Sequence, residues 1–316
     1  MVNTSKMILK IGTRASKLAL AQSQWVKAHV EARHPGIRVE LVSIKTTGDK
    51  ILDSPLSKIG GKGLFVKEIE DALIEKRVDV AVHSMKDVPA MLPDGLILST
   101  FPQREDPHDA LISKDGLSLD QLPHGAKVGT SSLRRAAQLL HIRRDLDLAP
   151  LRGNVDTRLK KLQSGDFSAI ILATAGLKRL GLEGHITSVI STDQILPAIG
   201  QGALGLETRA DDQDTMGILR FLNHEETEIT VRAERAFLNE LEGGCQIPIA
   251  GFARLEGTIV CLIGMVAELD GTRLIRDQAT GKRDQAEKIG ISLARRLLDK
   301  GADDILSRIY HSGVTR

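Results

Sequence analysis

The stretch LFVKEIEDALIEKRVDVAVH (residues 64–83) joins a helix pattern to a strand pattern. Val66, Ile69 and Leu73 recur at the spacing of one helix face, and charged residues fill most positions between them. VDVAVH (78–83) is short and mostly apolar, which is typical of a buried strand. A helix that runs directly into a buried strand is the repeating unit of an α/β fold.

The same alternation is present upstream. MILKIG (7–12) and IRVELVSIKT (37–46) are predicted strands, and a helical pattern lies between them. The apolar residues that we expect on one face of that helix are Leu18, Ala21, Trp25 and Ala28. The strand–helix–strand–helix–strand order predicts a parallel sheet. TTGDKILDSPLSKIGGKG (46–63) has no hydrophobic period and is predicted to be a long functional loop.

A stretch rich in proline and charge, STFPQREDPHD (99–109), interrupts the pattern, which then starts again. The predicted elements of this second α/β unit are strands at 110–113, 127–130, 146–151 and 167–176, and helices at 131–144 and 154–165. ILPAIGQGALGLETR (195–209) is predicted to be extended and to pass between the two lobes.

The pattern changes after residue 222. HEETEITVRAERAFLNELEGG (224–244) is a predicted helix, and three strands follow it with the hairpin signals Glu256-Gly257 and Asp270-Gly271. The apolar faces expected here are Ile229, Ala233, Phe237 and Leu241 on this helix, and Ala286, Ile289, Leu293 and Leu297 on a closing helix. The predicted fold class is α/β, with two doubly wound lobes and a small C-terminal α+β domain. The predicted domain limits are 1–102 with 203–222, then 103–202, then 223–316.

Charge is high but balanced, with 43 basic and 41 acidic residues and a net charge of +2. This balance gives no overall field that would attract nucleic acid or an anionic membrane. No apolar run approaches the roughly 20 residues of a membrane span, and the N-terminus lacks the apolar core of a secretory signal. Two cysteines, Cys245 and Cys261, make neither a disulfide framework nor a zinc site. We therefore expect a cytoplasmic monomer with no nucleic-acid or membrane partner.

Ligands of a parallel α/β sheet bind beyond the carboxyl ends of its strands. Polar side chains follow the predicted strands of both lobes, and six of them are arginines. These residues are Arg14, Ser16, Ser84, Lys86, Asp87, Thr130, Ser131, Ser132, Arg134, Arg135, Arg152, Arg158 and Arg179. Because guanidinium groups bind carboxylates and phosphates through paired hydrogen bonds, the pattern predicts a cleft for a polyanion. For any single arginine, a surface charge or an ion-pair partner is the alternative.

Two reactive side chains have open roles at this point. Asp87 is either an ion-pair partner of Arg14 or a nearby lysine, or a proton donor or counter-charge to a cationic intermediate. Cys245 follows Gly243-Gly244 and is either an exposed nucleophilic thiol or a turn cysteine without function. His83 is expected to be packed and hydrogen-bonded, and Cys261 to be buried in a core.

Eight sequence blocks stand in one order between residues 8 and 311. They are GTRASKLALAQ, GGKGLFVKEIE, DVAVHSMKDVP, GTSSLRRAAQL, LRGNVDTRLKKL, ATAGLKRLG, PAIGQGALG and GGCQIPIAG. In these blocks the chain resembles the porphobilinogen deaminase (hydroxymethylbilane synthase) family. Lys17 and Asp156 depart from the residues expected at their positions, and neither is a catalytic position.

The resemblance implies two lobes like those of periplasmic binding proteins, a third α+β domain, and a dipyrromethane cofactor attached by a thioether to Cys245. It implies a transferase of heme and tetrapyrrole biosynthesis that deaminates four porphobilinogens, joins them head to tail and releases hydroxymethylbilane. Each pyrrole ring carries an acetate and a propionate, which would be the anionic load of the cleft.

The resemblance also implies roles for individual residues. Asp87 would be the catalytic acid, with Lys86 and Arg14 in the same catalytic group. The implied cofactor-binding residues are Cys245, Ser84, Lys86, Asp87, Thr130, Ser131, Ser132, Arg134, Arg135, Gly176 and Gln201. The implied substrate-binding residues are Arg14, Ser16, Arg152, Arg158, Arg179, Lys62 and Phe65.

Two other classes of function fit parts of the pattern. A two-lobed solute-binding protein would bind an anion without chemistry, but the N-terminus carries no export signal and Cys245 lies on a third domain. A thiol enzyme acting through Cys245 would need a paired histidine, and none lies near that motif.

Overall fold

The computed structural model describes residues 7–50, 66–241 and 247–311. Its first sheet has five strands, which come from two separate parts of the chain, 8–100 and 204–209. The strands are β1 (Ile8–Thr13), β2 (Arg38–Ser43), β3 (Val80–Ser84), β4 (Leu96–Thr100) and β10 (Leu204–Arg209), in the order β2-β1-β3-β10-β4. β1 is parallel to β2 and β3, but β10 is antiparallel to β3 and β4. The three strands for which the sequence predicted a parallel sheet, β1, β2 and β3, are parallel, and the antiparallel strand β10 makes the complete sheet mixed.

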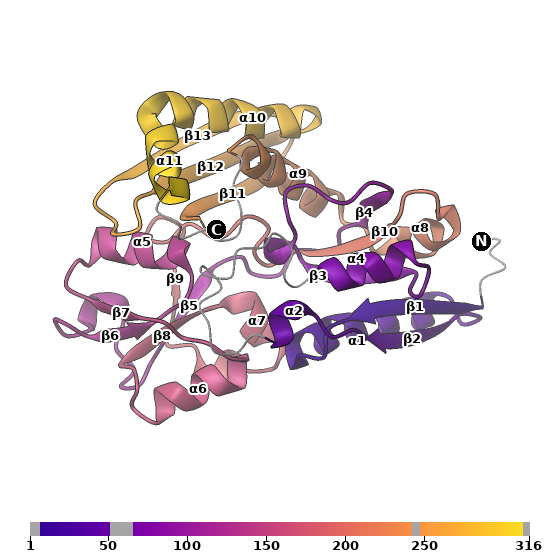
Figure 1. Ribbon diagram of the computed structural model, residues 1–316, viewed down its shortest axis with the longest axis horizontal. Helices are drawn as coiled ribbons and strands as arrows, with labels where there is room; N and C mark the ends of the chain where they lie inside the picture. Colours follow the sequence, from indigo (N-terminus) through magenta and orange to yellow (C-terminus); the bar gives the residue numbers. More distant parts are fainter. Residues whose placement is uncertain (1–6, 51–65, 242–246, 312–316) are drawn as a thin grey trace.

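Helices cover both faces of this sheet (Figure 1). On one face, Val26 and Val30 of one helix and Ile218 of another join a core with Leu9 and Ile11. The opposite face packs against a third helix in a separate core. The helices of this lobe are α1 (Lys17–Arg33), α2 (Thr47–Lys50), α4 (Lys67–Ile74) and α8 (Gln213–Leu219). This arrangement confirms the doubly wound lobe.

The buried face of α1 differs from the predicted one. Trp25 is 41% exposed and Ala28 is also exposed. The residues that α1 buries are Gln22, Ser23, Val26 and Val30. The Gln22 side chain donates a hydrogen bond to Ser84 Oγ at 2.9 Å. Because half of the buried face is polar, hydrophobic periodicity pointed to the wrong side of this helix.

The second sheet repeats the design of the first. Its strands are β5 (Asp109–Ser113), β6 (Lys127–Gly129), β7 (Asp147–Ala149), β8 (Ala169–Ala173) and β9 (Ser188–Ile190), in the order β7-β6-β8-β5-β9. Its helices are α5 (Leu133–Ile142), α6 (Val155–Gln163) and α7 (Thr174–Arg179). β7, β6 and β8 are parallel, whereas β5 is antiparallel to β8 and β9. Separate cores on its two faces confirm a second doubly wound lobe.

Two crossing segments join the lobes: residues 101–108 lead from β4 to β5, and residues 191–203 lead from β9 to β10. Each segment delivers the chain into the antiparallel strand of the other lobe. The predicted break at 99–109 is thus partly strand, because β4 extends to Thr100. The elements that were not predicted are β4, β9, α7, α8, α11 and α2, which lies inside the stretch 46–63 that was expected to be a loop. The strand expected at 167–176 ends at Ala173, and α7 begins at Thr174.

The C-terminal domain has an antiparallel three-stranded sheet with helices on one side. Its elements are α9 (Glu225–Glu240), β11 (Ile249–Glu256), β12 (Ile259–Ala267), β13 (Leu274–Lys282), α10 (Ala286–Leu297) and α11 (Asp303–His311). Phe237 of α9 is fully buried, and a Cβ at Gly264 of β12 would lie 2.5 Å from its ring. The predicted apolar faces of α9 and α10 are confirmed, with Ile229 only partly buried. Cys261 is partly exposed rather than buried.

Both predicted hairpins are present, and their glycines have positive φ values of 62° at Gly257 and 70° at Gly271. Gly271 also lies against α5, where a Cβ would come within 2.6 Å of the Ala137 carbonyl oxygen. In Figure 1 this domain lies above the junction of the lobes. The three sheets fall within the predicted domain limits, which themselves stay a prediction.

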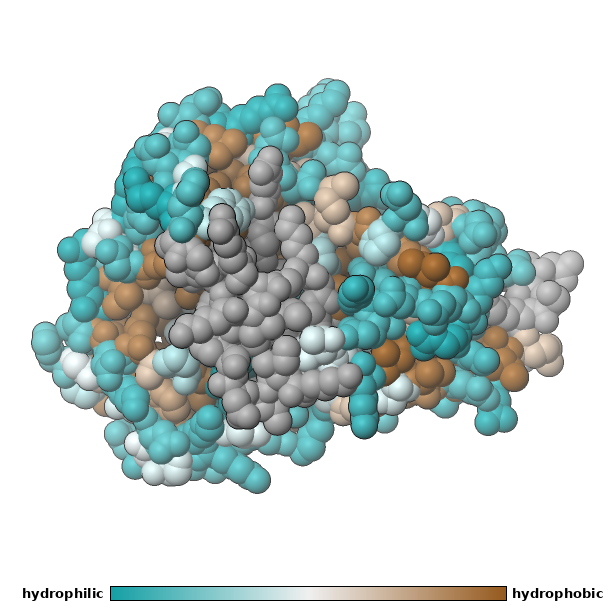
Figure 2. All heavy atoms as spheres, viewed as in Figure 1, coloured by the Kyte–Doolittle hydropathy of each residue, from teal (hydrophilic) through white to brown (hydrophobic). Residues whose placement is uncertain are grey.

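Hydrophilic residues dominate the outer surface in the view of Figure 2, with smaller hydrophobic groups between them. None of the described helices has the length and apolar character that crossing a membrane requires.

Candidate active site

A short turn at the end of β3 carries two of the predicted site residues. Met85–Asp87 form one turn of 3-10 helix, in which Met85 is buried and Lys86 and Asp87 are half-buried. The Met85 amide donates to the Ala203 carbonyl oxygen at 3.1 Å. With Ser84 held by Gln22 of α1, the turn is fixed to its own lobe and to a crossing segment.

The glycines of the crossing segment allow a close approach to this turn. Gly200 and Gly202 have φ values of 69° and 88°. A Cβ at Gly200 would lie 2.6 Å from Met85 Cβ, and a Cβ at Gly202 would lie 2.3 Å from the Glu105 carbonyl oxygen. A side chain at Gly200 would push the segment away from the turn, and one at Gly202 would push it away from the other crossing segment.

A cavity of about 20 Å³ lies where the turn, the crossing segment and the second lobe meet. Its lining brings together five predicted site residues from both lobes. They are Ser84, Lys86, Gly176, Arg179 and Gln201. The rule that ligands bind beyond strand ends therefore located a real junction.

Positive charges from the second lobe surround Lys86 and Asp87. Burial lowers the pKa of Lys86, opposed by the negative charge of Asp87 and reinforced by Arg135 and Arg158. Burial also lowers the pKa of Arg158 to about 10, reinforced by Arg135 and opposed by Asp87. Asp87 is thus within electrostatic reach of cations from both lobes.

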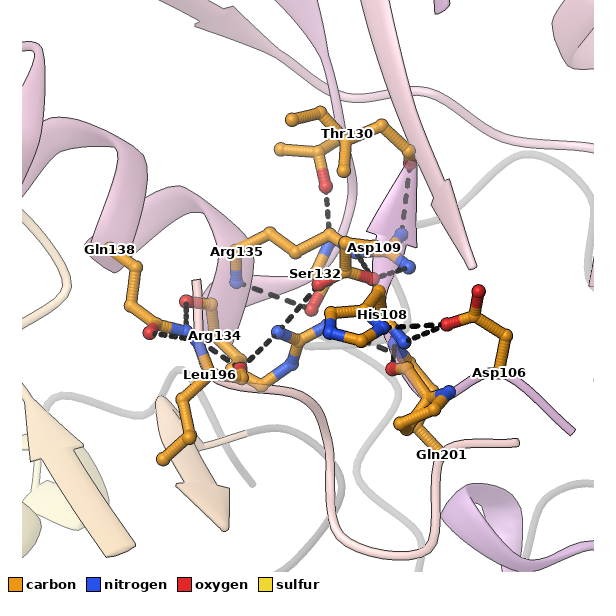
Figure 3. Close-up of polar contacts among 12 residues, drawn as sticks. Asp106, His108, Asp109, Thr130, Ser132, Arg134, Arg135, Gln138, Leu196 and Gln201 are labelled. Atoms are coloured by element: carbon orange, nitrogen blue, oxygen red, sulfur yellow. Dashed lines mark hydrogen bonds and ion pairs between the residues drawn. The ribbon is translucent and has the colours of Figure 1, made fainter. Parts of the chain in front are cut away.

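Arg134 and Arg135 are occupied by a buried acid that the sequence analysis did not single out. Asp109 is fully buried; Arg135 Nε and Nη2 donate to its Oδ1 at 3.0 and 2.7 Å, and Arg134 Nη1 lies 2.8 Å from its Oδ2 (Figure 3). Burial opposes ionisation of Asp109, but Arg134 and Arg135 outweigh it and hold its pKa well below the ordinary value. Asp109 lies in the stretch that was interpreted only as a break.

The same network reaches the crossing segment. Gln201 Nε2 donates to Asp109 Oδ1 at 3.0 Å and to the Pro107 carbonyl oxygen at 2.6 Å, and Arg134 Nη1 donates to the Leu196 carbonyl oxygen at 2.6 Å. Arg134, Arg135 and Gln201 are all buried. In this conformation their polar groups hold the junction together.

The hydroxyl groups at the start of α5 have protein partners. Ser132 caps the helix, with its Oγ accepting from the Arg135 amide at 3.4 Å. Ser131 Oγ exchanges hydrogen bonds with the Leu151 backbone at 2.8 and 3.0 Å, and Thr130 Oγ1 accepts from the Ser132 amide at 3.2 Å. These bonds fix the loop between β6 and α5 against the end of β7.

The remaining arginines lie at the rims of the two lobes. Arg14 and Arg152 are half-buried, after β1 and β7 respectively. Arg158 Nε donates to the Gly153 carbonyl oxygen at 2.8 Å. Arg179 Nη2 donates to the Gly202 carbonyl oxygen at 2.7 Å, and burial lowers the pKa of Arg179 to about 10.

Three predicted site residues, Cys245, Lys62 and Phe65, lie outside the described residues. Within the described ranges, no group of three or more His, Cys, Asp and Glu side chains is arranged to hold a metal ion.

A buried acid–histidine group lies beside α4, at the strand β3 that leads into the Met85–Asp87 turn. His83 Nε2 is 2.8 Å from Glu207 Oε2, and both side chains are almost fully buried, which confirms the interpretation of His83 as a packed residue. Glu70 of α4 is 6% exposed. Burial, and then the charge of Glu207, raise the pKa of Glu70 to about 7, against a smaller opposing effect of His83.

Glu70→Gln is expected to remove a pH dependence of stability. The folded protein holds the Glu70 proton up to about pH 7, whereas the ordinary pKa is 4.5. The stabilisation is therefore complete below about pH 4.5 and is lost as pH rises toward 7. Above pH 7 the free energy of unfolding of the variant should exceed that of the wild type by on the order of 3 kcal/mol.

Urea unfolding at pH 5 and pH 8 measures this difference. Asp94→Asn, which neutralises an exposed acid elsewhere in the same lobe, is the matched control and should keep the wild-type pH dependence. An unchanged pH dependence in Glu70→Gln would show that Glu70 is ionised throughout this range.

Comparison with known proteins finds matches over nearly the whole chain. The family model described as "Porphobilinogen deaminase, dipyromethane cofactor binding domain" matches residues 9–217. A second family model, "Porphobilinogen deaminase, C-terminal domain", matches residues 228–299. Among curated relatives, porphobilinogen deaminase of Syntrophotalea carbinolica is 55% identical over 305 residues, covering 96% of this chain and 97% of that protein. Porphobilinogen deaminase of Geobacter sulfurreducens is 54% identical over 308 residues, covering 98% and 96%.

A solved periplasmic substrate-binding protein of an ABC transporter from Coxiella burnetii matches 68% of this chain and 91% of its own, at 17% identity and a TM-score of 0.42, which is too low to support an inference. The two domain matches and the near-full-length relatives are decisive. This chain belongs to the porphobilinogen deaminase family and contains that family's dipyrromethane cofactor binding domain.

Proposed function

We propose that this enzyme deaminates four porphobilinogen molecules, joins them head to tail on a dipyrromethane primer and releases the linear tetrapyrrole hydroxymethylbilane. The observation that carries the proposal is the position of Asp87, an acid on a fixed turn of one lobe among Lys86 and the arginines of the other lobe. Family membership over nearly the full chain supports it.

The residues present fit an anionic cofactor and substrate. The pKa values of Lys86 and Arg158 are lowered because burial of their charges is only partly offset by protein acids. Carboxylates of a bound pyrrole would add further negative charge beside these cations. The cofactor, when bound, supplies the terminal pyrrole to which the next unit is added.

We assign the following roles to the chain's own residues. Asp87 donates a proton to the departing amine and stabilises positive charge that develops on the pyrrole ring. Lys86 and Arg14 belong to the same catalytic group. Carboxylate binding falls to the rim residues, which are Arg14, Ser16, Arg152, Arg158 and Arg179. Ser84, Gly176 and Gln201 line the cofactor end of the cleft.

The buried network suggests a structural role for two predicted cofactor ligands, Arg134 and Arg135. Arg134 and Arg135 are both paired with Asp109. We propose that they act mainly by holding the junction rigid, and that Arg135 adds positive charge near Lys86. Thr130, Ser131 and Ser132 similarly fix the loop from which the cleft wall is built.

A solute-binding protein without chemistry is the alternative function. The two-lobed fold would serve either role, but the named relatives are enzymes and the match includes the C-terminal domain. The monomeric state and the cytoplasmic location stay predictions.

Intact-mass spectrometry of the purified protein tests the proposal at the predicted attachment residue. The wild type should carry an added mass of two pyrrole units, and Cys245→Ser should lack both this mass and any product from porphobilinogen. Cys261→Ser, in β12, is the matched control and should keep both. A wild-type protein of unmodified mass that forms no product after preincubation with porphobilinogen would exclude this function.

A further inference from the structure

An ion pair joins the rims of the two lobes. Lys17 Nζ contacts Asp156 Oδ2, although the residues are 139 positions apart in the chain. Lys17 is the first residue of α1 in one lobe, and Asp156 lies in the first turn of α6 in the other. The side chains are 73% and 36% exposed, so solvent reaches the pair.

The pair lies where the lobes meet without a covalent connection. Beside it, a Cβ at Gly176 of α7 would be 3.7 Å from Leu18 of α1. Leu18 and Gly176 line one side of the small cavity, and the crossing segment at 200–203 lines another. Figure 1 shows the start of α1 beside α7 and near α6, away from the C-terminal domain.

This position determines what an opening motion would break. Both chain connections between the lobes run through the crossing segments, so these segments are where a rotation of one lobe against the other must be absorbed. Such a rotation separates α1 from α6 and α7. It therefore breaks the Lys17–Asp156 pair, while contacts within each lobe stay intact.

The neighbours of the pair connect it to the cleft. Lys17 follows Ser16 and lies three residues after Arg14, and Asp156 lies between Arg152 and Arg158. These four neighbours are four of the five substrate-binding residues assigned above, two from each lobe. The pair thus joins the two segments that carry these parts of the carboxylate-binding rim.

We propose that Lys17 and Asp156 form a latch that favours the closed arrangement of the lobes. An exposed pair of this kind contributes up to about 1 kcal/mol, which corresponds to a shift of up to about fivefold in the ratio of closed to open lobes. Because the pair is exposed, high salt should weaken it.

Hydrogen–deuterium exchange on the full-length holoenzyme tests the latch without using activity. Peptides that cover the starts of α1 and α6 should exchange two- to fivefold faster in Lys17→Gln and in Asp156→Asn. The charge swap Lys17→Asp with Asp156→Lys should return them to the wild-type rate. In 0.5 M NaCl the wild type should exchange as fast as the single variants.

A matched control breaks an exposed pair within one lobe. Arg77 Nε lies 2.6 Å from Glu75 Oε2, with side chains 52% and 59% exposed. Arg77→Gln should leave exchange at both rims unchanged. In turnover assays, the two latch variants should raise KM for porphobilinogen two- to fivefold, and the charge swap should restore it.

The outcomes separate this proposal from the function on which its kinetic part rests. Wild-type exchange in both single variants, or a charge swap that does not restore exchange, overturns the latch. If exchange follows the expected pattern but even the wild type forms no product, the latch stands and the proposed function fails.

Discussion

Asp109→Asn is expected to destabilise the folded protein by about 3–5 kcal/mol, because it leaves two buried guanidinium groups without their counter-charge. Asp109 is fully buried, and it pairs with both Arg134 and Arg135. Asparagine has nearly the same shape, so packing changes little and the loss reports the charge. The effect is large because water cannot replace the missing carboxylate inside the protein.

Urea or thermal unfolding of the variant measures this loss. Asp145→Asn is a matched control in the same lobe, because Asp145 accepts two hydrogen bonds from Arg143 at 2.8 and 2.7 Å but lies at the surface. Its loss should be much smaller, since solvent hydrates both groups. Equal unfolding midpoints for the two variants would contradict the view that the buried network holds the junction.

The Asp109 network also explains what the sequence could and could not predict about the site. The strand-end rule selected Ser84, Lys86 and Arg179, and all three line the small cavity at the junction of the lobes. It could not separate buried, paired arginines from those at the rim. The partner that occupies Arg134 and Arg135 lies about 26 residues upstream, in a segment with no periodic pattern.

A second buried acid was missed for a similar reason. Glu234 lies on α9, and the sequence analysis did not single it out. It is fully buried and accepts from Arg104 Nη1 at 2.6 Å, from the Gly200 amide at 2.6 Å and from the Ala253 amide at 2.8 Å. These partners come from both crossing segments and from β11. They are distant in sequence, so no local pattern predicts them.

The fold was more predictable than its connections. Apolar runs and helical periods identified both lobes and the third domain, since each element must bury its own apolar face. They could not give the direction of β5 and β10. A strand buried on both faces has the same composition whether its neighbours are parallel or antiparallel. That choice is made by the crossing segments, which return the chain to the sheet from the other lobe.

Asp87→Asn is expected to lower kcat by a factor of about 10²–10⁴, the usual contribution of a positioned general acid. Asparagine keeps the size of the side chain but neither releases a proton nor carries the negative charge that a cationic intermediate needs. Because the variant keeps Cys245 and the rim arginines, it should still bind the cofactor. Steady-state rates and the intact mass measure both expectations on one sample.

Asp94→Asn is the matched control for the loss of an acid from the same lobe. Asp94 is exposed and lies just before β4, so its variant should keep wild-type turnover. Asp87→Glu adds a second comparison, because glutamate restores the acid but lengthens the side chain. It should recover part of the lost rate if a proton donor is what the site requires.

These variants also decide between the two roles that position alone left open for Asp87. If Asp87 served only as an ion-pair partner for Lys86 or Arg158, its loss would lower the unfolding midpoint. Turnover per folded molecule would then stay within about tenfold of the wild type, since a structural pair contributes to stability rather than to the transition state. A normal midpoint with a rate loss of two or more orders of magnitude assigns Asp87 to the chemistry. The reverse pattern removes Asp87 from the catalytic group and leaves the cations of both lobes, Lys86 and Arg158 among them, to act on the bound pyrroles.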